Sequence, residues 1–307
     1  MSRHFVTIEE QSRADLAAIY DLARGPFDDE LLKGQGVALI FERPSLRTRA
    51  SSSSAIHELG GSATFFNDEE IGLDTRESAE DIGRTLAEMF AIAALRVRNH
   101  EVFARIRHAT EDRLSLINLL SNVAHPTQAV ADVLTLADHF AQGDVDALAG
   151  LEVAYVGDAT NVTRSLAVAL LRLGVNVTVG APRGYQLDAG GVEDPSAVRD
   201  GGTLRLTDSP SDAVENADAV CTDAWVSMGF EHEAARRRSD LAGFRVDQEL
   251  LHHAKVDAVV LHCLPAHRGD EITDQVLDGP QSLVWRQVWH RRSAMRGVLR
   301  WMKGDVQ

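Results

Sequence analysis

The stretch "GVALIFERPSLRTRASSSSAIHELGG", residues 36–61, joins a short apolar run to a segment rich in arginine and serine. The apolar run at 36–41 predicts a buried strand, and residues 47–58 predict a helix. Three arginines, Arg43, Arg47 and Arg49, lie close together at the junction. Because a helix start presents backbone N–H groups to an anion, this strand–turn–helix unit predicts an anion site at the end of a parallel strand.

The composition is that of a globular protein with about two domains of ordinary size. The chain has 307 residues, of which 44% are hydrophobic and 25% are charged, in the range of ordinary folded proteins. Its formal net charge of −15 argues against a general binder of nucleic acid or of anionic membranes. The clustered arginines therefore favour a small anionic ligand.

Cysteine content and the N-terminal sequence bear on the cellular compartment. The two cysteines, Cys221 and Cys263, are too few for a disulfide framework and suit a reducing compartment. The N-terminal stretch lacks the apolar core of a signal peptide, and no apolar run is long enough to span a membrane. We therefore expect a cytoplasmic protein.

Short apolar runs alternate with helix-like segments along the chain. A first series of predicted strands covers residues 36–41, 62–67, 92–97 and 114–120. A second series covers residues 151–158, 175–182, 217–223 and 258–265. The predicted helices lie at 8–23, 47–58, 78–90, 100–109, 125–142, 161–173 and 290–303. This rhythm predicts an α/β protein with two mostly parallel sheets, each flanked by helices.

A polar stretch divides the two series. The sequence "GDVDALAG", residues 143–150, follows a predicted helix and precedes a predicted strand. We therefore expect a first domain at 1–142, a second at 143–285, and a C-terminal helical segment at 286–307. No internal repeat at solenoid spacing interrupts this organisation.

Polar side chains stand at the ends of the predicted strands, where open α/β sheets bind their ligands. The first half places donors and cations there: Ser45, Leu46, Arg47, Thr48, Arg96, His125 and Gln128. The second half places a carboxylate, an amide and a thiol there, in the set Asn161, Asp223, Ser227, Met228, Cys263 and Leu264. Arginine forks onto phosphate oxygens, and the second set suits the ammonium and carboxylate of an amino acid. Together the halves predict transfer from a phosphorylated donor to an amine.

Four sequence blocks carry a resemblance to a known family. They are "FERPSLRTR" (41–49), "HPTQAVAD" (125–132), "DAWVSMG" (223–229) and "HCLPAHRGDEIT" (262–273). In order and spacing they resemble the aspartate/ornithine carbamoyltransferases, over nearly the whole chain. The last two blocks are similar to the ornithine branch of that family rather than the aspartate branch.

The resemblance implies a role for each residue of the blocks. It implies that carbamoyl phosphate contacts Ser45, Leu46, Arg47, Thr48, Arg96, His125, Gln128 and Arg291, the last from a C-terminal helix that returns to the first domain. It implies that L-ornithine contacts Asn161, Asp223, Ser227, Met228, Cys263 and Leu264. Arg96, His125 and Cys263 are then the catalytic residues. No cofactor and no metal is expected, and the assembly is expected to be a homotrimer, or a multiple of it, with active sites at subunit interfaces.

The resemblance implies a transferase of arginine metabolism and amino-acid biosynthesis. The implied reaction transfers the carbamoyl group of carbamoyl phosphate to the δ-amine of L-ornithine, giving L-citrulline and phosphate. A neutral amine attacks the carbamoyl carbon, the carbonyl oxygen gains charge, and phosphate leaves. The resemblance implies that Arg96, His125 and Thr48 stabilise that oxyanion and that Arg47 stabilises the leaving phosphate.

Some positions depart from the family pattern. Leu46 stands where threonine is usual, and Ser53 stands where the ornithine branch carries glutamate. In "WRQVWHRR", residues 285–292, Arg286 and His290 replace acidic and amide side chains. Two alternatives follow: a carbamoyltransferase for another amine, such as an N-acylornithine, a diamine or an unusual amino acid, or a weakly catalytic paralogue that binds these ligands. A dinucleotide site is disfavoured, because "YVGDATN" has one glycine where that fingerprint needs three.

Several of these residues also have ordinary structural interpretations. Asn161 and Asp223 are typical of turns and helix caps, and Cys263 alone is typical of a buried inert thiol. The basic run Arg236–Arg238 and the pair His252 and His253 are predicted to lie at the surface, because the histidines lack partners at zinc spacing.

Overall fold

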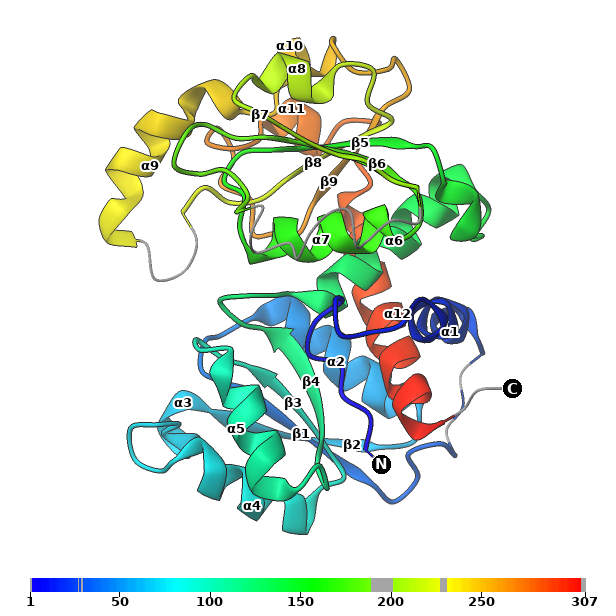
Figure 1. Ribbon diagram of the computed structural model, residues 1–307, viewed down its shortest axis with the longest axis vertical. Coiled ribbons are helices and arrows are strands. Elements are labelled where there is room, and N and C mark those ends of the chain that lie inside the picture. Colours follow the sequence, from blue (N-terminus) through cyan, green and yellow to red (C-terminus); the bar gives the residue numbers. More distant parts are fainter. Residues whose placement is uncertain (1, 27, 29, 189–200, 227–230, 305–307) are drawn as a thin grey trace. The chain divides into compact units, whose positions relative to one another are not determined.

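The computed structural model describes residues 2–26, 28, 30–188, 201–226 and 231–304. The chain divides into two compact units. Unit 1 comprises Met1–Ala131 and Trp289–Gln307, and unit 2 comprises Asp132–Val288. Each contains one parallel β-sheet with helices on its faces, which confirms the predicted fold class (Figure 1).

Unit 1 is built on a four-stranded parallel sheet with the strand order β2-β1-β3-β4. Its strands are β1 (Gly36–Phe41), β2 (Ser62–Asn67), β3 (Ile92–Arg96) and β4 (Ser115–Leu120). Its helices are α1 (Arg13–Arg24), α2 (Leu46–Glu58), α3 (Asp68–Ile71), α4 (Ala79–Met89) and α5 (Glu101–Thr110), with the first turns of α6 (Pro126–Phe140) and most of α12 (Val284–Lys303). Every residue of β3 is buried, as expected for a parallel strand covered on both faces.

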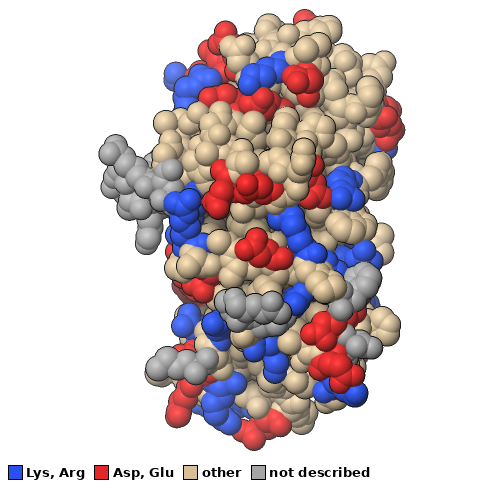
Figure 2. Space-filling view, turned by 90° about the vertical axis from the view of Figure 1, so that its right-hand side faces the viewer, with Lys and Arg blue, Asp and Glu red and all other residues tan. Residues whose placement is uncertain are grey.

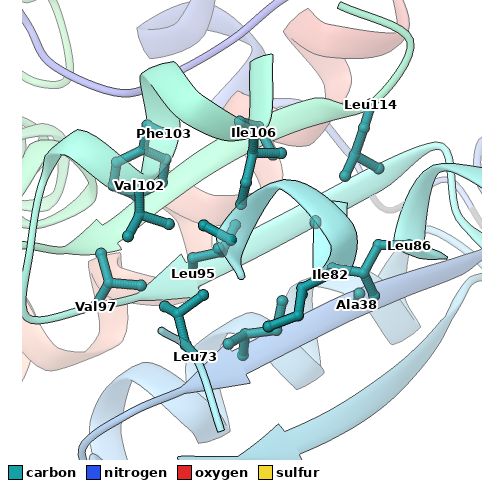
Figure 3. Close-up of a cluster of buried hydrophobic side chains, with 14 of the residues drawn as sticks. Ala38, Leu73, Ile82, Leu86, Leu95, Val97, Val102, Phe103, Ile106 and Leu114 are labelled. Carbon is teal, nitrogen blue, oxygen red and sulfur yellow. The ribbon is translucent and has the colours of Figure 1, made fainter. Parts of the chain in front are cut away.

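Helices α4 and α5 cover one face of this sheet. Ile82 and Leu86 of α4 and Ile106 of α5 pack with strand residues such as Ala38 and Leu95 (Figure 3). These side chains are nearly or fully buried. Their burial removes apolar surface from water, which is the main favourable term in folding. The strand ends are thereby held on a rigid base.

The C-terminal helix α12 packs against the N-terminal helix α1, as predicted for a helix that returns to the first domain. Gly297 lies so close that an added Cβ would be 2.5 Å from the Ile19 carbonyl oxygen. Arg296 donates to the Ala23 carbonyl at 2.7 Å, and the Trp301 indole donates to the Asp15 carboxylate at 2.9 Å. The helix begins at Val284 rather than near 290, so Arg291 lies within it and not at its first turn.

Unit 2 contains a five-stranded parallel sheet with the strand order β7-β6-β5-β8-β9. Its strands are β5 (Glu152–Val156), β6 (Asn176–Gly180), β7 (Leu204–Thr207), β8 (Ala219–Thr222) and β9 (Val259–His262). Its helices include α7 (Asn161–Leu171), α8 (Pro210–Val214), α9 (Ala234–Leu241), α10 (Gln248–Leu251) and α11 (Asp274–Leu277). The 3₁₀ turns are η1 (Asp146–Leu148), η2 (Glu231–Glu233) and η3 (Ala242–Phe244).

The two faces of this sheet are covered by different helices. Residues of α8, α10 and α11 form a buried cluster with β5, β8 and β9, whereas α7 lies across the opposite face (Figure 1). Strand β7 was not predicted. It has only four residues, all half-buried or exposed, so it shows none of the apolar continuity on which the strand predictions rest.

Charged side chains of both signs share the face shown in Figure 2. Both basic and acidic side chains are visible there and lie interspersed. Within the described residues, no helix has both the length and the apolar character needed to cross a bilayer.

Candidate active site

In unit 1, the residues named by the sequence lie at or just beyond the ends of the three strands β1, β3 and β4, apart from Arg291 on α12. The strands run parallel in neighbouring positions, so their carboxyl ends share one edge of the sheet. The chain leaves β1 for β2 on one side and then crosses to β3 on the other, which makes the β1/β3 boundary a topological switch point. Helix α2 starts on one side of that boundary, and Arg96, the last residue of β3, stands on the other.

The start of α2 is organised by Ser45. Its Oγ accepts from the Thr48 backbone N–H at 3.4 Å and donates to Thr48 Oγ1 at 2.9 Å, as an N-cap residue does. Arg47 is half-buried on the same first turn. The Leu46 side chain is 79% exposed and has no hydrogen-bond donor. At this position only the backbone N–H can therefore donate to a ligand.

Arg291 ties the start of α2 to the start of α6. Its guanidinium donates to Thr48 Oγ1 at 3.0 Å and to the Gln128 side-chain oxygen. All three side chains are buried. Thr48 Oγ1 accepts from both Ser45 and Arg291, so its own proton is the part of the hydroxyl left to donate to a ligand.

His125 lies at the start of α6, where its carbonyl accepts the amide hydrogens of Gln128 and Ala129. Burial, together with the positive charges of Arg291 and Arg96, holds the pKa of His125 well below its ordinary value. The imidazole is therefore neutral at pH 7. A neutral imidazole that feels the charges of two arginines can donate or accept a hydrogen bond without adding positive charge.

Five of the predicted residues of unit 1 thus form one polar cluster. Thr48, Arg96, His125, Gln128 and Arg291 are all buried. Arg291 donates hydrogen bonds to Thr48 and Gln128. The positive charges of Arg291 and Arg96 both act on His125. Two buried arginines in one polar cluster are an arrangement that can bind an anion.

In unit 2, the named residues follow β5, β8 and β9, which are neighbours in the sheet. The order reverses at β5, from which the chain runs outward to β6 and β7 before returning to β8. Asn161 begins α7 directly after β5, and Asp223 directly follows β8. The two side chains therefore flank the switch point of this sheet.

Asp223 and Cys263 are in direct contact. Cys263 Sγ donates to Asp223 Oδ1 at 3.0 Å, and that oxygen also accepts from the Ala224 backbone N–H at 2.7 Å. Asp223 is 9% exposed, and Cys263 and Leu264 are half-buried. The structure thus brings together two predicted residues, Asp223 after β8 and Cys263 after β9. Ser227 and Met228 lie outside the described residues.

The donor atoms of Asp223, His262 and Cys263 lie within 4.8 Å of one another, so this group can in principle hold a metal ion. Both ring nitrogens of His262 are already engaged. Nδ1 accepts from the Leu264 backbone N–H at 2.9 Å, and Nε2 lies 3.0 Å from the Glu271 carboxylate. Coordination through His262 would break one of these contacts.

Arg237 is buried, which corrects the prediction that the run Arg236–Arg238 lies at the surface. Its Nη1 lies 2.5 Å from Asp158 Oδ2 and its Nε lies 2.9 Å from Glu233 Oε2. Nη1 also donates to the Trp225 carbonyl at 3.3 Å. Asp158 comes from the end of β5, far away in sequence, so no local pattern reveals the pair. In the sequence, only the four-residue spacing between Glu233 and Arg237 indicated an ion pair.

The Asp158–Arg237 pair predicts a distinctive pH dependence. Burial raises the pKa of Asp158 to about 6 against the opposing effect of Arg237. Between the ordinary value of 3.8 and about 6 the folded protein therefore holds a proton that the unfolded chain releases. Stability contributed by this group is present below that window and falls as pH rises through it.

We expect Asp158→Asn to remove this dependence. Urea unfolding of the parent and the variant from pH 4 to pH 7 measures it. The stability of the parent relative to the variant should fall by on the order of 2–3 kcal/mol as pH rises. A relative stability that instead grows with pH would mean that Arg237, not burial, dominates the carboxyl group.

The departures from the expected family pattern occupy varied surroundings. Arg286 is half exposed and pairs with Asp138 at 2.6 Å. His290 is buried and its ring meets Trp289 edge to face at 4.9 Å between centroids. Ser53 is half-buried on α2. The hydrogen bonds of Arg291 to Thr48 and Gln128 form despite these departures.

Both halves of the chain match family models. The model described as "Aspartate/ornithine carbamoyltransferase, carbamoyl-P binding domain" covers residues 3–138, and the model described as "Aspartate/ornithine carbamoyltransferase, Asp/Orn binding domain" covers residues 149–302. The chain belongs to the aspartate/ornithine carbamoyltransferase family. The family assignment confirms the resemblance carried by the four sequence blocks.

Relatives in the family are similar over nearly the full chain. The ornithine carbamoyltransferase of Acidothermus cellulolyticus is 40% identical and covers 97% of this chain and 96% of its own. The anabolic ornithine carbamoyltransferase of Pyrococcus furiosus is 39% identical, over 90% of this chain and 86% of its own. The solved structure of ornithine carbamoyltransferase from Pyrococcus furiosus superimposes with a TM-score of 0.91 at 35% identity, covering 100% of this chain and 98% of that chain.

Proposed function

We propose that this protein transfers the carbamoyl group of carbamoyl phosphate to the δ-amine of L-ornithine, giving L-citrulline and phosphate. The observation that carries the proposal is the distribution of charge between two strand-end clusters. Buried arginines gather in unit 1, and a buried carboxylate beside a thiol stands in unit 2. The curated relatives named above support the choice of ornithine as acceptor.

Carbamoyl phosphate binds to unit 1 in this proposal. The backbone N–H groups of the α2 start and the forks of Arg47 and Arg291 hold the phosphate. Arg96 and His125 face the carbonyl end. Because the preformed cluster leaves the Thr48 proton to donate, that hydroxyl joins them at the carbonyl oxygen.

L-Ornithine binds to unit 2. Asp223 receives the α-ammonium group in a charge-assisted hydrogen bond, and Asn161 supplies an amide to the amino-acid head. Ser227 and Met228 are proposed to contact the same head. Cys263 and Leu264 line the path of the δ-amine, which reacts in its deprotonated form.

The chemical step moves charge from the amine to the leaving phosphate. The δ-nitrogen forms a bond to the carbamoyl carbon, the C–O bond to phosphate breaks, and the proton lost by the amine ends on the released phosphate. Arg96, neutral His125 and Thr48 stabilise the oxygen that becomes negative, an effect worth several kcal/mol where donors are preorganised (about 3–4 kcal/mol for one donor). Arg47 and Arg291 stabilise the departing phosphate.

In this proposal each predicted domain binds one of the two substrates. Residues 1–142, completed by 286–307, bind carbamoyl phosphate, and residues 143–285 bind L-ornithine. We further propose that the protein is cytoplasmic and acts as a homotrimer, or a multiple of it, with each active site at a subunit interface. Sedimentation of the purified protein tests the assembly.

A second amine acceptor is the main alternative, because Leu46 replaces a threonine in the anion-binding motif. Purified protein is incubated with carbamoyl phosphate and, in parallel, L-ornithine, N-acetylornithine, putrescine, lysine or aspartate. Product is identified by mass. A protein-free sample corrects for cyanate formed when carbamoyl phosphate decomposes.

We expect ornithine to be the clearly preferred acceptor. Preference for any other amine would assign the protein to a different carbamoyltransferase. Binding of carbamoyl phosphate or ornithine without any product would instead favour the weakly catalytic paralogue.

A further inference from the structure

A histidine–carboxylate pair is buried beneath the turn that carries Cys263 and Leu264. His262 ends strand β9, and Glu271 lies in the loop that follows. Their side chains are 0% exposed, and His262 Nε2 lies 3.0 Å from Glu271 Oε1. A fully buried polar pair requires a reason, because desolvating it is costly unless its hydrogen bonds are satisfied.

The contacts on the two ring nitrogens select one tautomer of His262. Nδ1 accepts from the Leu264 backbone N–H at 2.9 Å, so it carries no proton. Nε2 then carries the proton and donates it to Glu271. Glu271 thereby orients the ring so that Nδ1 faces the backbone of the next turn, as carboxylates orient histidines in other functional sites.

Glu271 also holds the far end of the same loop. Its Oε1 accepts from the His267 backbone N–H at 2.6 Å. One carboxylate oxygen therefore binds the strand end at His262 and the loop at His267. The residues between these two contacts include Cys263 and Leu264.

The backbone of this turn is in an unusual conformation. Leu264 has φ of 59°, in the left-handed region that residues with a Cβ seldom adopt. Residues held in such conformations require surrounding contacts that fix them and are concentrated at functional sites. The contact from Leu264 N–H to His262 Nδ1 is one that fixes this residue.

We propose that His262 and Glu271 are positioning residues that fix the Cys263–Leu264 turn and thereby shape the acceptor site. Glu271 sets the tautomer, His262 Nδ1 holds the Leu264 N–H, and the held turn presents the Cys263 thiol to Asp223 at 3.0 Å. The consequence for acceptor binding rests on the proposed function, whereas the consequence for the thiol does not.

Two variants of His262 separate the ring nitrogens. In His262→Asn the side-chain oxygen sits near the position of Nδ1 and can still accept from Leu264. In His262→Gln the carboxamide reaches the position of Nε2, and the acceptor for Leu264 is lost. His253→Gln, at an exposed histidine of the same unit, serves as the control.

Two readouts are measured on each variant. The first is the alkylation rate of Cys263 by iodoacetamide at one pH, followed by peptide mass so that buried Cys221 is distinguished. The second is KM for L-ornithine beside KM for carbamoyl phosphate. We expect His262→Gln to speed alkylation by about tenfold and to raise KM for ornithine by about tenfold, with carbamoyl phosphate unaffected. His262→Asn should stay within about threefold of the parent in both.

Equal effects of the Asn and Gln variants, or no effect of the Gln variant, would overturn the proposal, because the ring would then act only as core filling. Should His262→Gln fail to fold, His262→Ala, which also lacks an acceptor for the Leu264 N–H, replaces it in the comparison with His262→Asn. Parental thiol reactivity in His262→Asn beside faster alkylation in His262→Ala supports the role of Nδ1, and equal reactivity in the two variants refutes it. If the protein forms no citrulline, the proposed function fails, but the alkylation measurement still tests the turn.

Discussion

Arg291→Lys is expected to lower kcat/KM for carbamoyl phosphate by about 10²–10³-fold while the protein remains folded. The guanidinium of Arg291 reaches two elements at once, Thr48 of α2 and Gln128 of α6. A lysine keeps the charge but offers a point donor on a flexible stem, so it cannot hold both partners and a phosphate oxygen together. Steady-state kinetics at saturating ornithine measures the effect.

The neighbouring Arg292 provides a matched control. It pairs with Glu58 at 3.0 Å and lies over the Trp289 ring, with a side chain 31% exposed. Arg292→Lys makes the same chemical change one residue along the same helix and should alter kcat/KM by less than about threefold. Similar losses in the two variants would show that α12 acts through its stability and not through Arg291.

Asp223→Asn is expected to raise KM for L-ornithine by about 10–100-fold. The variant keeps the shape of the side chain but removes the charge that receives the α-ammonium group. Carbamoyl phosphate affinity, measured alone by calorimetry, should be unchanged, because its proposed ligands belong to the other unit. Kinetics with ornithine as the varied substrate completes the comparison.

Asp240→Asn is the control for this change. Asp240 is exposed in unit 2 and accepts the Tyr185 hydroxyl at 2.8 Å. Its replacement should leave both KM values near those of the parent. An equal loss of carbamoyl phosphate affinity in Asp223→Asn would contradict the division of the two substrates between the units.

Much of the fold is readable from continuous apolar runs. Strands β1 and β2 occupy the predicted residues 36–41 and 62–67, because each run ends at polar or turn-forming residues. Strand β7 escapes the same reasoning, since only four residues pair at the sheet edge and none of them is buried. Edge strands receive little of the burial that makes a strand visible in sequence.

The clustering of polar side chains at one sheet edge was predictable, because parallel strands deliver their ends there. Ser45, Arg96 and His125 are far apart in the chain, yet each stands at or just beyond the end of a neighbouring strand of one sheet. The hydrogen bonds among them were not predictable. That Arg291 joins Thr48 to Gln128 depends on where α12 packs within unit 1.

Buried ionic and polar pairs were the hardest features to foresee. Arg237 stands in a run of three arginines, and only its partner Asp158 at the end of β5 accounts for its burial. His262 belongs to the "HCLP" block, but its partner Glu271 could not be recognised from the sequence. The contact forms only because the loop returns Glu271 to the end of β9. In both cases the deciding partner is fixed by tertiary structure and not by local pattern.

The most direct test of the central claim follows the new covalent bond. Purified protein is supplied with carbamoyl phosphate carrying ¹³C in the carbamoyl group and with L-ornithine carrying ¹⁵N at the δ-amine, and the product is observed by ¹³C NMR. The proposed function predicts a carbamoyl carbon split by one-bond coupling to the δ-nitrogen, formed in step with phosphate. A labelled carbon bonded to the α-nitrogen, or label appearing only in the hydrolysis products of carbamoyl phosphate, would contradict it.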